Sequence, residues 1–453
     1  MAADLRSFLR AAEEAGRVRR VRREVDPDAN MGELCSQSDN PLLFESVKGY
    51  PGWRVAAALM QGRVDQALAL GCSTGDVVSH LAARFAEGPG EIARVSRAPV
   101  KAKKFSGGAA DLFRLPVCRH SEEDGGRYIG AGISLVRDPT SGVQNTTYPR
   151  TQLLPGRHPR VFISSRHTWE IINAWRRQGH PRMPMALVIG HHPAYEVAAG
   201  YSGEHPGWGE EALAPRLLGE PLEVIECETC DLLVPAAAEI VVEGELKLTD
   251  FEEEGPFGNY MGNYEFSFTP SPVFEVRCIT MREDAYYRHI QSTTWTDHQS
   301  LFCMQTEALV YRACREAGLE VHDVHIPPWG CACLTVVQMT PRHEEDVARA
   351  LDLAVKWPIT PARMSKLGVA VDRDVDIYDA RDVWWAVSVR ANTRRAVLEI
   401  LDPEKRSQRS HRLGIDATCP PPKNERQRFF QSKARPCGWG KVRLEDFLAP
   451  AGS

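Results

Sequence analysis

The chain has 453 residues, of which 43% are hydrophobic and 25% charged, and its formal net charge is −5. This composition is typical of a soluble globular protein, and a chain of this length is expected to form two or three domains. The small negative charge excludes a global attraction to nucleic acid or to an anionic membrane. The longest apolar runs, such as "PMALVIG", are too short to span a bilayer.

The first hundred residues alternate between helix and strand signals. The start of the chain predicts an amphipathic helix, whose apolar face carries Leu5, Phe8, Leu9 and Ala12. The acidic residues of this helix argue against a transit peptide, and no secretory signal is present, so we expect a cytoplasmic protein. Arginines interleave with valines at 17–23, which predicts a solvated edge strand. Two helices closed by glycine are predicted at 62–71 and 74–90.

From about residue 125 to 295 the sequence changes to many short β-rich runs separated by turns. Such a pattern favours a barrel-like or sandwich-like β core, interrupted by one helix in "HTWEIINAWRRQG". Residues 297–319 predict a long connecting helix. The chain then returns to α/β texture, with a strand in "CLTVVQM", a helix in "HEEDVARALDLAVKW" and a strand in "SKLGVAVD".

The twelve cysteines are scattered and are expected to be reduced thiols. Cys227 and Cys230 form one C-x-x-C pair, and Cys331 and Cys333 form a C-x-C pair. A structural zinc site usually needs two halves of matched spacing. Because these pairs are distant and unlike, a zinc enzyme is the weakest hypothesis.

Four polar segments lie beside apolar strands in the β-rich middle of the chain. They are "NTTYPR" from Asn145 to Arg150, "SSRHTW" with His167, "CETCDLLVPAAAEIVVEGEL" with Glu228, and "EGPFGNYMGNY" with Glu254. Each has a plain structural explanation, such as a turn, a helix cap or a surface ion pair. Periodicity and spacing alone do not unite them.

Their order along the chain, however, resembles the UbiD family of prenylated-FMN-dependent (de)carboxylases. The resemblance extends over nearly the whole chain, from "LLFESVKGYP" to "GIDAT", and is most specific at 227–258. It implies a multi-domain α/β (α+β) fold with a central split β-barrel flavin-binding domain. The implied divisions are an N-terminal α/β segment at 1–120, the prenylated-FMN-binding domain at 121–296, a linker helix at 297–320 and a C-terminal α/β dimerisation domain at 321–453.

The resemblance also implies a metal site formed by Asn145, His167 and Glu228. This mixed oxygen and nitrogen set suits Mn²⁺, or Mg²⁺, better than a thiolate-preferring ion. In the family, this ion and a nearby K⁺ anchor the phosphate of the prenylated FMN. The implied cofactor-binding residues are Asn145, Thr147, Arg150, His167, Glu228 and Lys366.

The implied catalytic residues are Arg150, Glu254 and Asn259. Arg150 matches the arginine that binds the substrate carboxylate, and Glu254 matches the first glutamate of a Glu-Arg-Glu network. Asn259 stands where other members have the glutamate that protonates the carbon after CO₂ leaves. An amide cannot act as a general acid near neutral pH. The proton therefore comes from Glu254, from water or from a group such as His298, or Asn259 binds a polar substrate atom, or the site is impaired.

The function implied is reversible non-oxidative decarboxylation of an aromatic, heteroaromatic or α,β-unsaturated carboxylic acid. The prenylated FMN would act as a covalent electron sink, and a flavin prenyltransferase would supply it. We expect a homodimer or larger homo-oligomer, with no nucleic-acid or membrane partner. The alternatives are a non-catalytic or impaired flavin-binding homologue and an ordinary FMN oxidoreductase, although no Gly-rich dinucleotide motif supports a nicotinamide partner.

Overall fold

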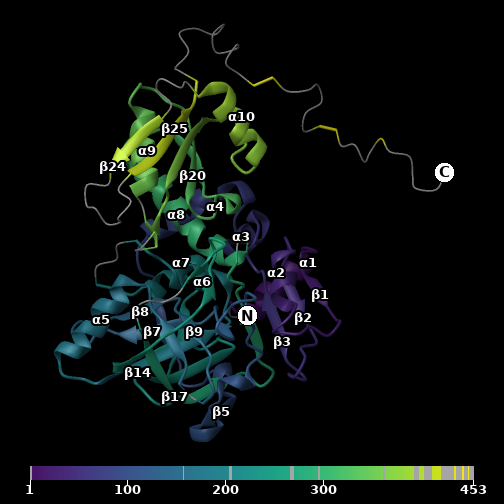
Figure 1. Cartoon of the computed structure of the whole chain (residues 1–453), viewed down its shortest axis with the longest axis vertical. Coiled ribbons are helices and arrows are strands. Elements are labelled where there is room, and N and C mark those ends of the chain that lie inside the picture. Colours follow the sequence, from purple (N-terminus) through teal and green to yellow (C-terminus); the bar gives the residue numbers. More distant parts are fainter. Residues whose placement is uncertain are drawn as a thin grey trace.

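A computed structural model describes residues 3–156, 158–203, 207–265, 270–293, 296–356, 358–360, 363–391, 397–401, 411–419, 433–434, 441–442 and 447. It has a mixed α/β architecture, as the sequence predicted (Figure 1). The β-rich middle of the chain lies at the bottom of this view, and the C-terminal α/β unit lies above it. The domain boundaries at 120, 296 and 320 stay predictions, and parts of the predicted C-terminal domain lie outside the described residues.

The N-terminal segment combines short helices with a small sheet. Helix α1 (Leu5–Glu14) is capped by Asp4, whose side chain accepts a hydrogen bond from the Ser7 amide, and the four predicted apolar residues are buried. The sheet has the order β1-β2-β3-β18: β1 (Arg19–Val21), β2 (Leu42–Phe44), β3 (Arg54–Ala57) and β18 (Tyr286–His289). The predicted edge strand is therefore confirmed as β1. The helices that follow are α2 (Met31–Ser36), α3 (Arg63–Leu70) and α4 (Val77–Ala86).

The middle of the chain forms a nine-stranded sheet in which long antiparallel strands are central. Its order is β6-β9-β10-β17-β14-β11-β7-β8, with β5 paired to β17. The strands are β5 (Lys103–Ser106), β6 (Tyr128–Ile129), β7 (Ile133–Arg137), β8 (Gln144–Thr147), β9 (Arg150–Gln152), β10 (Arg160–Phe162), β11 (Arg182–Ile189), β14 (Ile240–Glu252) and β17 (Ser271–Met281). Helices α5 (Arg166–Arg177), α6 (Pro193–Ala199) and α7 (Ala214–Leu218) connect them.

Two smaller β elements flank this sheet. One is a three-stranded sheet of β13 (Leu233–Pro235), β12 (Leu222–Glu226) and β4 (Ile92–Arg94). The other is the hairpin of β15 (Phe257–Gly258) and β16 (Tyr264–Glu265). Short 3₁₀ turns are η1 (Thr74–Asp76), η2 (Pro99–Lys101), η3 (Gly107–Ala109), η4 (Leu112–Arg114), η5 (Glu210–Leu213) and η6 (Pro328–Gly330).

The long predicted helix is confirmed as α8 (Asp297–Glu316), which leads into the C-terminal unit. That unit contains a five-stranded sheet of β19 (Val321–His325), β20 (Leu334–Met339), β23 (Leu367–Asp372), β25 (His411–Ala417) and β24 (Val397–Leu401), in this order. Its other elements are α9 (Asp346–Lys356), α10 (Ala380–Arg390), β21 (Pro358–Thr360) and β22 (Arg363–Met364). Among the described residues, no helix is long and apolar enough to cross a membrane.

Buried ion pairs hold α8 against the segments on either side of it. At its start, Arg288 of β18 bonds to Glu196 of α6 and to Asp297, and all three side chains are at most 2% exposed. Further along α8, Glu307 accepts hydrogen bonds from Arg63 of α3 and from His325 of β19. Glu307 thus connects the N-terminal segment, α8 and the C-terminal sheet.

We expect Glu307 to make the fold sensitive to acid. Burial opposes its charge, but the Arg63 guanidinium and the hydrogen bond from His325 lower its pKa to about 2. A carboxyl with a depressed folded-state pKa stabilises the fold above its unfolded pKa and loses this contribution as the pH falls towards 2. Glu307→Gln should therefore lower the free energy of unfolding by about 3 kcal/mol at pH 7 and by much less at pH 3.

Urea unfolding midpoints at pH 7, 5 and 3 would measure this difference. The matched control is Glu316→Gln at the exposed end of the same helix, where Glu316 pairs with Arg312. A constant gap between wild type and Glu307→Gln over this pH range would contradict the prediction.

Candidate active site

The site is built around an ion pair between Arg150, at the start of β9, and Glu254, in the loop after β14. Arg150 Nε lies 2.8 Å from Glu254 Oε1, and Nη2 lies 2.7 Å from Oε2. The arginine side chain is 9% exposed and the carboxylate 0%. This is the bidentate geometry that a guanidinium prefers with a carboxylate. The predicted contact between Glu254 and Arg150 is therefore present, whereas their catalytic roles stay predictions.

Two aromatic rings and a second acid complete the surroundings of Arg150. The guanidinium carbon lies 4.1 Å from the centre of the Phe162 ring and 4.8 Å from that of Phe257. Its remaining Nη1 lies 3.1 Å from Glu265 Oε2. No sequence motif marks Glu265, because only the hairpin pairing of Phe257 with Glu265 brings this acid back to the arginine.

The loop that carries Glu254 is held tightly from the opposite side. The Gly125 amide donates to the Pro256 carbonyl at 2.8 Å, and the Gly258 amide donates to Asp124 at 2.7 Å. A Cβ at position 125 would lie 2.3 Å from the Gly255 carbonyl oxygen, so only glycine fits there. The close approach fixes the position of the carboxyl group that the loop presents.

Asn259 is buried in the hairpin turn and is only 4% exposed. Its side-chain oxygen accepts a hydrogen bond from the Met261 amide at 2.8 Å. Its side-chain nitrogen has no hydrogen-bond partner among the described residues. A buried amide donor without a partner is costly, which is consistent with a ligand acceptor at this position.

His298, in the first turn of α8, lies beside this turn. Its ring packs edge-on against Tyr260 at 5.2 Å, and its Nδ1 lies 3.1 Å from Ser292 Oγ. Burial, aided by the nearby His120, lowers the pKa of His298 to about 3. The imidazole is therefore neutral at pH 7.

Asn145 forms a hydrogen bond with Glu210, a carboxylate that was not among the predicted site residues. Its Nδ2 donates to Glu210 Oε1, and its Oδ1 accepts from Thr168 Oγ1 at 3.0 Å. Glu210 is 2% exposed, and its other oxygen also accepts from the Thr146 amide. His167 adjoins Thr168 in the first turn of α5 and is exposed. The available signal for Glu210 was the paired acids in "GWGEEALA", which by themselves indicate only a solvated turn.

Glu228, the predicted third metal ligand, has other partners. Its carboxylate accepts from Lys104 and lies 3.1 Å from Lys101 Nζ. The hydrogen bond from Lys104 lowers the pKa of Glu228, and Lys101 acts in the same direction. The hydrogen-bond geometry therefore favours Glu210, not Glu228, as the carboxylate beside Asn145.

The other two predicted cofactor-binding residues lie in different parts of the structure. Thr147 ends β8 and is half-buried, and its carbonyl accepts from Ser134 Oγ at 3.3 Å. Lys366 precedes β23 and is exposed. Neither position tests the proposed contact with a cofactor.

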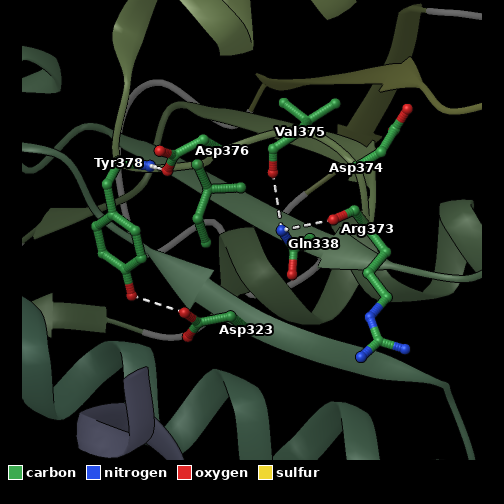
Figure 2. A pocket seen from close by; sticks show the side chains of 8 residues that line it. Asp323, Gln338, Arg373, Asp374, Val375, Asp376 and Tyr378 are labelled. Atoms are coloured by element: carbon green, nitrogen blue, oxygen red, sulfur yellow. Dashed lines mark hydrogen bonds between the residues drawn. The ribbon is translucent and has the colours of Figure 1, made fainter. Parts of the chain in front are cut away.

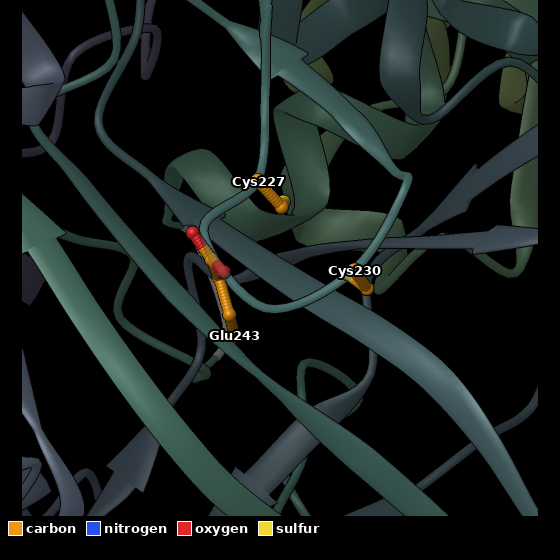
Figure 3. Close-up of side chains that lie close together, drawn as sticks. All are labelled: Cys227, Cys230 and Glu243. Carbon is orange, nitrogen blue, oxygen red and sulfur yellow. The ribbon is translucent and has the colours of Figure 1, made fainter.

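The two cysteine pairs do not lie together in one group of potential metal ligands among the described residues. Cys227, Cys230 and Glu243 have ligand atoms within 4.8 Å of one another (Figure 3), whereas Cys331 and Cys333 belong to no such group among the described residues. Glu243 Oε2 already accepts hydrogen bonds from the Glu228 and Thr229 amides and from Thr229 Oγ1, and Lys101 lies 3.4 Å from Oε1. Glu243 therefore orders the 227–230 loop.

An open pocket lies in the C-terminal unit, away from the predicted site residues in the chain. Figure 2 shows it beside β20, where the Gln338 amide reaches the carbonyls of Arg373 and Val375 and where Tyr378 donates to Asp323. None of the predicted catalytic or metal-binding residues lines it.

Most of the chain matches the domain models of one protein family. Residues 9–85, 92–294 and 299–417 match the N-terminal, Rift-related and C-terminal domains of 3-octaprenyl-4-hydroxybenzoate carboxy-lyase, UbiD. The chain belongs to the UbiD family. It is accordingly an enzyme of the carboxy-lyase class.

Individual relatives agree over nearly their full lengths. An evolved dimeric form of the UbiD-class enzyme HmfF from Pelotomaculum thermopropionicum, in complex with prFMN, is 33% identical with a TM-score of 0.88, and the alignment covers 99% of this chain and 100% of that one. The 3,4-dihydroxybenzoic acid decarboxylase AroY of Klebsiella pneumoniae is 22% identical over 98% and 99% of the two chains, with a TM-score of 0.85, and shows the fold alone. An uncharacterized Archaeoglobus fulgidus protein is 29% identical over 92% of this chain and 91% of its own.

Proposed function

We propose that this enzyme catalyses the reversible non-oxidative decarboxylation of an aromatic, heteroaromatic or α,β-unsaturated carboxylic acid with prenylated FMN. The observation that carries the proposal is the buried bidentate pair of Arg150 and Glu254. The likeness to a prFMN-bound HmfF structure at 33% identity supports the cofactor. Loss of CO₂ from an sp² carbon leaves charge that side chains cannot delocalise, and the prenylated flavin supplies the electron sink.

The residues of the chain bind and orient the acid. Arg150 uses Nε and Nη2 for Glu254 and Nη1 for Glu265, so the substrate carboxylate would bind the N–H groups that remain on Nη1 and Nη2. Phe162 and Phe257 keep water from the cation and strengthen its electrostatic attraction for that carboxylate. Glu254 holds Arg150 in place and takes part in proton transfer.

Asn259 contributes to substrate selection. Its side-chain oxygen is engaged by the hairpin, so the amide nitrogen is the group that remains for a ligand. A donor at this point favours substrates with an acceptor, such as a ring nitrogen or a hydroxyl oxygen. The proton for the new C–H bond then comes from Glu254, from water, from His298 or from another carboxyl group.

The residues near Asn145 fit the phosphate-anchoring metal of the family. An amide oxygen, an imidazole and a buried carboxylate form an oxygen and nitrogen set suited to Mn²⁺ or Mg²⁺. Asn145 and His167 would be two of the ligands, and we propose Glu210 as the third in place of Glu228. Thr147, Lys366 and a K⁺ ion would complete the binding of the cofactor phosphate.

The enzyme is proposed to act as a homodimer or larger homo-oligomer and to receive its cofactor from a flavin prenyltransferase. The dimeric form of the similar HmfF supports the first point. A non-catalytic homologue or an ordinary FMN oxidoreductase would lack acid-dependent CO₂ release, so one experiment distinguishes all three.

Co-expression with a flavin prenyltransferase should yield protein with a prenylated-FMN absorption spectrum and mass. This holoenzyme should release CO₂ from one class among 4-hydroxybenzoate, nicotinate and cinnamate. The measurements are the cofactor spectrum, its mass and CO₂ release from each acid. Protein that binds no flavin would refute the proposal.

Replacing Arg150 by Ala should lower kcat/KM by at least about 100-fold, because the carboxylate loses its bidentate partner. Glu254→Gln should lower turnover by a similar factor, about 100-fold or more, because an amide cannot accept or donate the proton. The exposed neighbour Glu253→Gln is the matched control. Near-normal turnover by well-folded Arg150→Ala protein would contradict the assigned role.

Two isosteric variants test the metal ligands. Glu210→Gln should weaken Mn²⁺ binding by at least about 10-fold, whereas Glu228→Gln should leave it unchanged, because only Glu210 contacts Asn145. Titration of each protein with Mn²⁺, followed by the EPR signal of the free ion, measures the affinity without turnover. The reverse pattern would restore Glu228 as the ligand and exclude Glu210.

A further inference from the structure

The hairpin after Glu254 returns the chain to Arg150. Asn259 organises its turn: the Asn259 amide donates to the Asn263 carbonyl at 3.0 Å, and the side-chain oxygen accepts from Met261. Beyond the turn, Glu265 pairs across the hairpin with Phe257, whose ring lies against the arginine. The turn that Asn259 organises therefore brings Glu265 to Arg150 as the second acid.

This acid and Glu254 share one guanidinium. Glu254 occupies Nε and Nη2, and Glu265 Oε2 lies 3.1 Å from Nη1. Arg150 is thereby flanked by two carboxyl groups, although the position expected to supply the second carries an amide. The two acids come from different elements, the loop after β14 and strand β16.

We propose that Glu265 carries the proton that forms the new C–H bond, in place of the missing glutamate at position 259. The inference rests on the decarboxylase function proposed above. A carboxyl group can hold and deliver a proton, which the Asn259 amide cannot do. With a substrate carboxylate also bound, three carboxyl groups would face one guanidinium, and this crowding of negative charge favours one proton on the cluster.

The step balances with water as the source of the proton. The bond between the carboxylate carbon and the adjacent substrate carbon breaks. CO₂ leaves, and the electron pair of that bond stays on the substrate side. Glu265 gives its proton to that carbon and becomes a carboxylate. Water then returns a proton to Glu265, and the reverse sequence of steps describes carboxylation.

The two acids, Glu265 and Glu254, differ in their exposure to solvent. The Glu265 side chain is 23% exposed, whereas that of Glu254 is 0% exposed. Glu265 can therefore exchange protons with solvent in each cycle, whereas the Glu254 side chain has no exposed surface through which to do so. His298 is neutral in its buried site, with its Nδ1 beside Ser292, and so lacks the charge of a ready acid.

The test is Glu265→Gln in the prenylated-FMN holoenzyme, with 4-hydroxybenzoate, nicotinate and cinnamate as probes. Deuterium exchange from D₂O into phenol, pyridine or styrene reports proton transfer without loss of CO₂. Both this exchange and kcat should fall by at least about 100-fold, and the limb of the pH profile that Glu265 contributes should disappear. The Kd of the acid, measured by calorimetry, should not rise, because Arg150 and Glu254 remain.

Glu265→Asp should retain part of the exchange, and Glu253→Gln should match wild type. Exchange and kcat at wild-type levels in Glu265→Gln would overturn the inference while leaving the decarboxylase function intact. A raised Kd with unchanged kcat would also overturn it, because Glu265 would then only shape the binding site. A wild-type holoenzyme that neither exchanges nor decarboxylates any probe would remove the proposed function and this role with it.

Discussion

The site depends on how the charge of Arg150 is compensated inside the protein. Burying an ion pair costs several kcal/mol of hydration, and removing one partner typically destabilises a protein by about 3–5 kcal/mol. Arg150 is therefore surrounded by groups that stabilise its positive charge: a bidentate carboxylate, two aromatic rings and a second carboxyl.

The surrounding fold satisfies this requirement through rigid backbone contacts. The glycine at 125 allows two loops to approach closely, and Asp124 anchors the hairpin through the Gly258 amide. The long strands β14 and β17 pair along most of their length and fix where the loop and the hairpin emerge. The flexible side chains at the site are thus held by inflexible main chain, as precise positioning of reacting groups requires.

Much of the architecture could be predicted, because helices and strands follow local hydrophobic periodicity. The buried face of α1, the edge position of β1 and the length of α8 are all visible in the sequence. The pairing of Arg150 with Glu254 was predicted from the order of family motifs. Contacts that depend on tertiary structure were not found: Glu210 lies 65 residues from Asn145, and Glu265 lies 115 residues from Arg150. Glu228 was predicted as a metal ligand from the order of family motifs, whereas the contact between Glu210 and Asn145 appears only in the folded structure.

Helix α8 has its first turn at the site and its middle at the C-terminal sheet. At its start, Asp297 bonds to Arg288 of β18, and His298 packs against Tyr260 of the hairpin beside Arg150. Further along, Glu307 bonds to Arg63 and His325. Since successive residues of an α-helix turn by about 100°, a one-residue insertion between these positions would rotate Glu307 away from both partners. The length of the helix therefore fixes the rotation of the C-terminal sheet relative to the site at the start of α8. Recombination between relatives would therefore have to preserve both the number of residues separating the two ends of α8 and the partners Arg63 and His325.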